Sequence, residues 1–455
     1  MQLTVKTNFN GGNNMLIKGI VVGVLILVML IPGTLVSDLV SERQARQADV
    51  VKEVTDKWAG NQVVTGPVLM LPYKQQITLA DNKVATVTKA AYILPDELNI
   101  QINITPKEKK RSLYSVMLYQ SESRLSGKFN MLPLEALQID PETVVWKDAR
   151  LLMSVSDERG INDHVVLEWN GKTQMLEAGV PENTALKSGI SSPVEVDAAG
   201  QVTFAIKLSL RGSGQLYYTP VGKITETQIS AAWKDPAFDG KFLPVSSEIG
   251  DDKFSARWKV LPLSRAYPQY WKEGTQDLEK AAFGVRLIQA VDGYSKTHRS
   301  VKYAMLFVAL TFAFFYFLEG IHKLRIHPVQ YLLVGIALII FYTLLLSLSE
   351  YTGFNAAYGI AAVATITLVA TYVGGLFKNT RIVAGFTIAL TALYTYIFLI
   401  IQSEDYALLF GSIGLFGIMA VIMYFSRKVD WYAVSRQTGN TGNDTAGEAM
   451  VPATE

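Results

Sequence analysis

Six long apolar stretches constrain this chain more than any other feature of its sequence. A helix needs about 20 mostly apolar residues to cross the roughly 30 Å of hydrocarbon in a bilayer. One stretch lies near the N-terminus, and the others follow one another in the last third of the chain. The sequence therefore predicts six transmembrane helices, at Gly19–Val36, Tyr303–Leu318, Tyr331–Leu348, Phe354–Leu376, Ile382–Ile401 and Tyr406–Phe425.

The first apolar stretch could be a cleaved signal peptide or a permanent anchor. A signal peptide ends at a cleavage site flanked by small residues. The segment that follows, SDLVSERQARQADVV (37–51), lacks that pattern and has the composition of a polar helix, with Glu42 and Arg46 at i,i+4 spacing. We therefore expect an uncleaved anchor whose helix continues to about Trp58.

The charges at the ends of the C-terminal spans alternate in sign, which predicts an orientation. Short cytoplasmic loops are enriched in Lys and Arg. One side of the predicted bundle carries the basic residues Lys323, Arg325, Lys378, Arg381, Arg427 and Lys428. The other side carries the acidic residues Glu350, Glu404 and Asp405. Both chain termini are therefore predicted to be cytoplasmic, and residues 38–300 to lie outside the cytoplasm.

The long segment between the first and second spans has the pattern of a β-sheet domain. Apolar and polar residues alternate from Val202 to Leu210, as in a strand that buries one face. Asn170 and Gly171 form a two-residue hairpin signal between two short apolar runs. We expect a large, mainly antiparallel β domain, either one domain or two sandwich-like halves, so that the whole chain is an α+β membrane protein.

These patterns divide the chain into five expected segments. They are a cytoplasmic N-terminus (1–18), a first transmembrane helix (19–37), a β-rich external domain that opens with a helix (38–300), a five-helix transmembrane bundle (301–426) and a cytoplasmic tail, disordered at its end (427–455).

Glu319 is the first candidate for a functional residue, because ionisable side chains at membrane depth are usually functional. Two interpretations are open: a helix-surface ion pair with Lys323 at i,i+4, or a proton relay. His322 and His327 flank the same turn and could titrate near neutral pH or bind a metal. Two imidazoles without a third ligand favour packing at the membrane interface instead.

The acids at the external ends of the spans form a second candidate set. Glu350 ends one span, and Glu404 and Asp405 precede another. Together they could coordinate a hard divalent cation. The alternative is that they are solvated loop residues, since acids before a helix also complement its dipole.

The sequence contains no motif that assigns an enzymatic reaction. There is no cysteine, so disulfides, thiolate nucleophiles and cysteine metal sites are excluded. A net charge of +2 over 455 residues gives no reason to expect nucleic acid as a partner. We expect no catalytic residue, no cofactor and no metal, and a role that is not enzymatic.

Several long segments resemble the CreD family of bacterial inner-membrane proteins. They are LEGIHKLRIHPVQYLLVGIALIIFYTLLLSLSEYTGF (318–354), QSEDYALLFGS (402–412), VDWY (429–432), ERQARQADVV, VTGPVLMLPY, DPAFDGKFLP, FSARWKV and YSKTHRSVKYA. The resemblance implies a Gram-negative inner-membrane protein, so that the external domain is periplasmic. It also implies expression under a two-component system and links to envelope integrity, colicin tolerance and the β-lactam response.

Two functional hypotheses follow, with the lipid bilayer as a partner in both. The first is an envelope-integrity protein whose periplasmic domain binds an envelope protein, a glycan precursor or a lipid. The second is a transporter or lipid-handling protein with its pathway in the helix bundle, near Glu319. A third class, an enzyme acting on envelope glycan or peptide, would need paired acids or a nucleophile that converge in the periplasmic domain.

Overall fold

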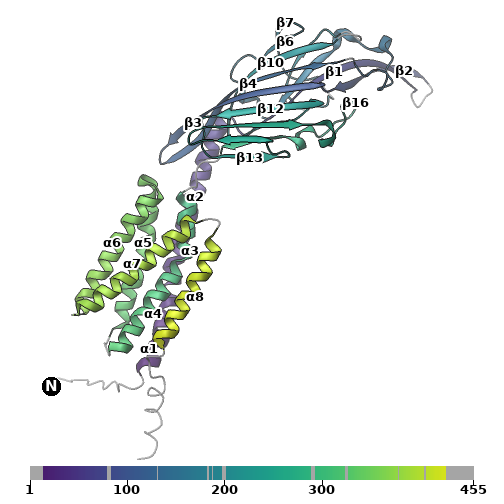
Figure 1. The fold of residues 1–455 in the computed structure, drawn as a ribbon. Helices are drawn as coiled ribbons and strands as arrows, with labels where there is room; N and C mark the ends of the chain where they lie inside the picture. The colour runs from purple at the N-terminus through teal and green to yellow at the C-terminus, as the bar shows by residue number, and fades with distance from the viewer. Residues whose placement is uncertain are drawn as a thin grey trace, which may run out of the picture. The chain divides into compact units, whose positions relative to one another are not determined.

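The computed structural model divides the chain into two compact units (Figure 1). A helical unit comprises residues 1–46 and 291–455, and a β-sheet unit comprises residues 47–290. The structure describes residues 14–78, 83–130, 132–181, 184–186, 188–196, 201–287, 293–322, 326–377, 379–403 and 406–426.

Most helices of the helical unit are long and apolar and run beside one another (Figure 1); α3 is short and polar, and the part of α2 after Arg46 belongs to the β-sheet unit. The described helices are α1 (Asn14–Val28), α2 (Leu30–Trp58), α3 (Gly293–Lys302), α4 (Ala304–His322), α5 (Pro328–Thr352), α6 (Phe354–Leu376), α7 (Thr380–Gln402) and α8 (Ala407–Ser426). Local sequence fixes their ends. Asn379 caps α7 by accepting a hydrogen bond from the Arg381 backbone, and Gly353 separates α5 from α6 with a positive φ of 77°.

Four helical segments of the described chain are long and apolar enough to cross a membrane. They are Ile17–Trp58, Pro328–Thr352, Phe354–Leu376 and Thr380–Gln402. A fifth span arises if α3 and α4, which meet at a bend of 41°, cross together. The sixth predicted span coincides with α8, where several side chains lie outside the described residues. An N-terminal apolar helix and a C-terminal set are thus confirmed, and the number six stays a prediction.

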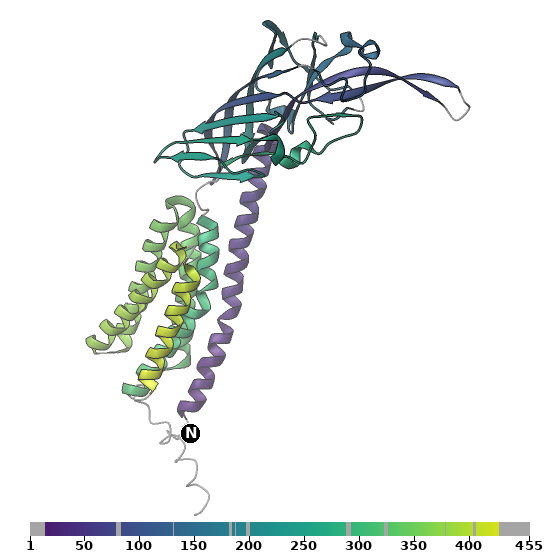
Figure 2. The ribbon, with the colours of Figure 1, turned by 45° about the vertical axis from the view of Figure 1, so that its right-hand side comes forward.

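The β-sheet unit contains two sheets, which share one apolar core (Figure 2). The nine-stranded sheet has the order β13 (Pro236–Gly240), β17 (Phe283–Leu287), β11 (Gln215–Tyr218), β1 (Gln62–Thr78), β5 (Arg150–Val155), β9 (Ile190–Pro193) and β8 (Glu177–Ala178). Two more strands branch from this path: β2 (Val84–Ile93) pairs with β1, and β16 (Tyr270–Lys272) pairs with β2. The eight-stranded sheet has the order β14 (Ser246–Ile249), β15 (Phe254–Val260), β12 (Ile224–Ala231), β3 (Glu97–Arg111), β4 (Tyr114–Phe129), β10 (Val202–Ser213), β6 (Val166–Trp169) and β7 (Lys172–Met175). Short 3-10 helices occupy Pro141–Thr143, Trp146–Asp148, Glu158–Gly160, Pro262–Ser264 and Leu278–Ala281.

Most strand pairs are antiparallel, as the sequence predicts, but both sheets are mixed. The parallel pairs are β1 with β11 and β3 with β12. The chain segment that connects the two strands of each parallel pair contains hairpins of the other sheet. No local sequence signal predicts such long-range pairing. The predicted hairpin at Asn170 and Gly171 is confirmed, because both residues have positive φ and join β6 to β7.

One contiguous core joins the two sheets, which resolves the alternative between one domain and two halves in favour of a single packed unit. Strand β10 shows how: Val202, Phe204 and Ile206 point inward and are buried, while the residues between them face outward. Strand β3 alternates in the same way. The period-two pattern therefore leaves the outer face of the eight-stranded sheet polar.

Candidate functional site

Glu319 lies in a buried polar cluster of the helical unit. Its carboxylate forms an ion pair with Lys18 of α1, and it also accepts hydrogen bonds from the Ile326 backbone N–H at 3.2 Å and from the Tyr331 hydroxyl at 3.3 Å. Glu319 is only 8% exposed. A charge with so little water around it is stable only when it is paired and hydrogen-bonded. The cluster therefore ties α1 to α4 and α5.

The close packing of α1 against α4 explains why Lys18 reaches this carboxylate. Gly19 lies beside the Tyr316 ring, and a Cβ at this position would be 3.3 Å from the Tyr316 hydroxyl. The absence of a side chain lets the helices approach. Lys323, the partner that the sequence suggests, lies outside the described residues. Sequence reasoning missed Lys18, because a contact across 301 positions has no local signal.

Of the two histidines near this cluster, the structure describes the side chain of His327 but not that of His322. His327 caps α5: its Nδ1 accepts a hydrogen bond from the Val329 N–H at 3.3 Å, and the His327 N–H donates to the Gln330 Oε1 at 3.0 Å. This capping box accounts for His327 as a structural residue. His322 is the last residue of α4, and its side chain lies outside the described residues.

Glu350, near the end of α5, is held in a second polar cluster. Its Oε1 accepts a hydrogen bond from the Tyr294 hydroxyl at 2.9 Å and lies 3.9 Å from the Arg43 guanidinium. Only 9% of the Glu350 side chain is exposed, so it is not the solvated loop residue that one interpretation of the sequence offered. Nearby, Lys296 donates to Gln402 at 3.0 Å.

The structure gives no support to a cation site at these acids. Glu404 and Asp405 lie outside the described residues. Within the described part of the chain, no three His, Asp or Glu side chains lie close enough together to hold a metal ion. The divalent cation hypothesis therefore stays untested.

The β-sheet unit carries a different polar surface, a row of side chains that crosses six strands. The strand registers place Ser246 opposite Arg257, Arg257 opposite Gln228, Gln228 opposite Gln101, Gln101 opposite Arg124, and Arg124 opposite Lys207. We call these six residues the transverse row. All belong to the outward-facing set of their strands, so they lie on one face of the eight-stranded sheet.

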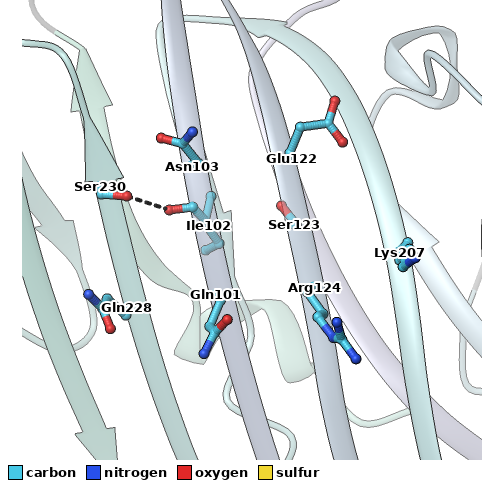
Figure 3. Close-up of a pocket in the computed structure, with 9 residues that line it drawn as sticks. All are labelled: Gln101, Ile102, Asn103, Glu122, Ser123, Arg124, Lys207, Gln228 and Ser230. Carbon is cyan, nitrogen blue, oxygen red and sulfur yellow. Dashed lines mark hydrogen bonds between the residues drawn. The ribbon is translucent and has the colours of Figure 1, made fainter.

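Figure 3 shows the part of this face around β3 and β4. Gln101 and Gln228 lie next to each other, and the guanidinium of Arg124 points away from the carboxylate of Glu122 on the same strand (Figure 3). The hollow over these residues has a volume of about 530 Å³. A second hollow of about 460 Å³ shares Gln101 and Gln228 and continues toward Arg257. The two form one groove along the transverse row.

Some charged side chains in the groove have an interaction partner, and others have none among the described residues. Among the described residues, none forms an ion pair with Arg124, Lys207 or Arg257. The neighbouring acids have their own partners: Glu122 accepts a hydrogen bond from the Ser209 hydroxyl at 2.7 Å, and Glu226 pairs with Lys259 at 2.8 Å. Three cations of the transverse row are thus left available to a ligand.

Alternation in NIQINIT predicts that Asn99, Gln101 and Asn103 share one face of a strand. Sequence reasoning nevertheless missed the transverse row. The residues that stand opposite them on other strands are set by the registers between segments far apart in the chain. One of these registers is the parallel pairing of β3 and β12.

The apolar helices at both ends of the chain and the inserted β-sheet unit define a multi-pass membrane protein with a large mixed β-sheet domain. The family model described as "Inner membrane protein CreD" matches residues 14–432. The chain is also similar to Inner membrane protein CreD of Escherichia coli (strain K12), with 31% identity over 420 residues that cover 90% of this chain and 92% of that protein. This chain belongs to the CreD family of inner membrane proteins.

Proposed function

We propose that this protein is a non-enzymatic binding protein of the cell envelope, anchored in the inner membrane by its helices, with a periplasmic β-sheet unit that binds an envelope component. The observation that carries the proposal is the open groove along the transverse row. Arg124, Lys207 and Arg257 in this groove form no ion pair with a described residue, whereas Lys259 pairs with Glu226, and this favours a surface kept for a partner. The distribution of basic residues at the helix ends supports cytoplasmic termini.

Site-specific photo-crosslinking in the native membrane tests this proposal. A photoreactive side chain replaces Gln101 in the groove, and in a matched variant it replaces Glu177 on β8, which is exposed at the edge of the other sheet. We expect an adduct with a component of the envelope from Gln101 and not from Glu177. Equal yields from both positions, or no adduct from Gln101, would contradict the proposed binding role.

The second candidate function is a transport or lipid-handling pathway through the bundle. The observation that favours it is a buried carboxylate, Glu319, with Tyr331 within hydrogen-bonding distance. Its engagement by Lys18 supports a structural role instead. A Glu319→Gln variant that folds normally but loses an envelope phenotype would favour the pathway, and one that keeps the phenotype would count against it.

The family resemblance adds cellular expectations that stay predictions for this chain. They are envelope integrity, colicin tolerance, the β-lactam response and control by a two-component system. A binding protein in the periplasm is compatible with each of them. Deletion of the gene, complemented by the chain with or without an intact groove, would relate the phenotype to the transverse row.

A further inference from the structure

We propose that the ligand of the groove is an acidic glycan, which lies across the strands along the transverse row with its carboxylates on the cations. This inference rests on the proposed binding role and specifies its ligand. Three kinds of observation carry it: the spacing of the cations, the amide side chains between them and the direction of the groove.

The cations lie at two places along the row: Arg124 and Lys207 stand directly opposite each other on neighbouring strands, and Arg257 lies three strands away from Arg124. Arg257, Arg124 and Lys207 occur on three of its six strands, with Gln228 and Gln101 between the two arginines. A single phosphate or a small anion would occupy the pair of Arg124 and Lys207 alone and leave Arg257 unused. Cations at two separated places on one face match a polymer that carries acidic groups at intervals.

The amide side chains of Gln101 and Gln228 favour a sugar as the ligand. A glutamine side chain offers both a donor and an acceptor, which suits the hydroxyl and acetamido groups of a sugar. Asn103 and Ser230 stand opposite each other in the next row and add neutral polar groups there, while Glu122 follows Asn103 on β4 and accepts a hydrogen bond from Ser209. A surface of this kind favours a sugar chain over a lipid, which would need exposed apolar side chains beside the cations.

The direction of the groove fits an extended chain. Neighbouring strands lie about 4.8 Å apart, so a row over six strands is about 24 Å long. The row runs perpendicular to the strands and lies on the face of the sheet. A peptide that added itself as a further strand would instead pair with an edge such as β14, and would leave Gln101 and Arg124 untouched.

Binding to the purified full-length protein in lipid nanodiscs tests the inference. The acidic probe is a strand of alternating N-acetylglucosamine and N-acetylmuramic acid with free carboxylates, and the neutral probe is a chitin oligosaccharide of the same length. We expect the acidic strand to bind at least tenfold more tightly, with an affinity that falls as salt is added. Equal affinity for the two probes would overturn the inference.

Variants separate the contribution of the cations to binding from that of the amide side chains. The double variant R124Q/K207Q is expected to lose at least tenfold in affinity for the acidic strand and to keep its affinity for chitin. The double variant Q101A/Q228A is expected to weaken both. K172Q, on the exposed strand β7, removes one positive charge elsewhere and should change neither. An unchanged affinity of R124Q/K207Q for the acidic strand would overturn the inference.

Polyglutamate serves as a third probe. Binding as tight as that of the acidic glycan would show a general anion surface and overturn the assignment of a sugar. If Gln101 gives an envelope adduct but no glycan preference is measured, the proposed binding role survives and this inference fails. If Gln101 gives no adduct and no probe binds, both fail. Protection of Gln101 from crosslinking by the acidic strand alone would support both.

Discussion

Buried acids in the helical unit have ion-pair partners, whereas the exposed cations of the transverse row in the β-sheet unit have none among the described residues. In the helical unit, Glu319 and Glu350 are nearly buried, and each has a basic partner and a tyrosine hydroxyl. In the β-sheet unit, three exposed cations of the transverse row form no ion pair with any described residue. An unpaired charge is costly where water is absent and cheap on a wet surface. We therefore expect the pairs to stabilise the helical unit, and we expect the exposed cations of the transverse row to contribute little to the stability of the fold.

The largest expected effect is the loss of one partner in the Glu319 cluster. Glu319→Ala leaves Lys18 without its acid and the Ile326 N–H without its acceptor. Breaking a fully buried pair costs roughly 3–5 kcal/mol, but Lys18 keeps 32% of its side chain exposed, so we expect a loss of roughly 2 kcal/mol in the free energy of unfolding. Thermal unfolding in nanodiscs measures it.

A double variant serves as the control for that measurement. Lys18→Met combined with Glu319→Met removes both charges at once, and it should recover most of the lost stability. If the single Glu319→Ala variant unfolds at the wild-type temperature, the contact is not needed for folding, and the contrast between the units is wrong.

Glu350 should show a smaller effect of the same kind. Glu350→Ala removes the acceptor of the Tyr294 hydroxyl and the distant partner of Arg43. A hydrogen bond to a charged group contributes roughly 1.5 kcal/mol, so a loss of that order is expected in the same assay. Tyr294→Phe tests the hydrogen bond alone. Additive losses in the double variant would mean that the two side chains do not interact.

Asp157 shows that the β-sheet unit also pairs charges where its fold requires it. The Arg159 side chain, followed by the Gly60 backbone N–H, lowers the pKa of Asp157 to about 2 against a partial opposing effect of burial. A depressed folded-state pKa stabilises the fold at pH values above the ordinary pKa of 3.8, and this stability is lost as the pH falls toward 2. The expected loss is roughly 1 kcal/mol, after discounting for solvent screening.

Urea unfolding of the wild type and of Asp157→Asn at pH 7 and pH 3 measures this contribution. The variant should be less stable at pH 7, and the difference should shrink at pH 3. A difference that is the same at both pH values would exclude the carboxylate charge as its cause.

The smallest expected effect on stability concerns the transverse row. Arg124→Gln and Lys207→Gln remove exposed charges without described partners, so each should change the free energy of unfolding by less than about 0.5 kcal/mol. Chemical unfolding of the purified protein checks this. A loss as large as that of Glu319→Ala would mean that the row holds the fold together, and the two units would no longer differ.

Local patterns predicted most of the elements but not their contacts. Alternation identified β10, and the Asn170 and Gly171 signal identified the turn between β6 and β7, because side-chain period and turn chemistry act over a few residues. Apolar length identified the spanning helices. The pairing of Glu319 with Lys18 and the register that aligns Gln101 with Arg124 depend on contacts between distant segments. Sequence reasoning therefore proposed Glu319 as a candidate and Lys323 as its partner, but could not identify Lys18.

Cysteine accessibility tests whether the groove is periplasmic and occupied in the envelope, and the absence of native cysteines makes single-cysteine labelling specific. Single cysteines at Gln101 and Glu177 would be labelled with a membrane-impermeant maleimide in cells with a permeabilised outer membrane. The account predicts that both react, that Gln101→Cys reacts more slowly than Glu177→Cys in the native envelope, and that this difference disappears after purification. No labelling at either position, or the same rate ratio before and after purification, would contradict a periplasmic groove occupied by an envelope component.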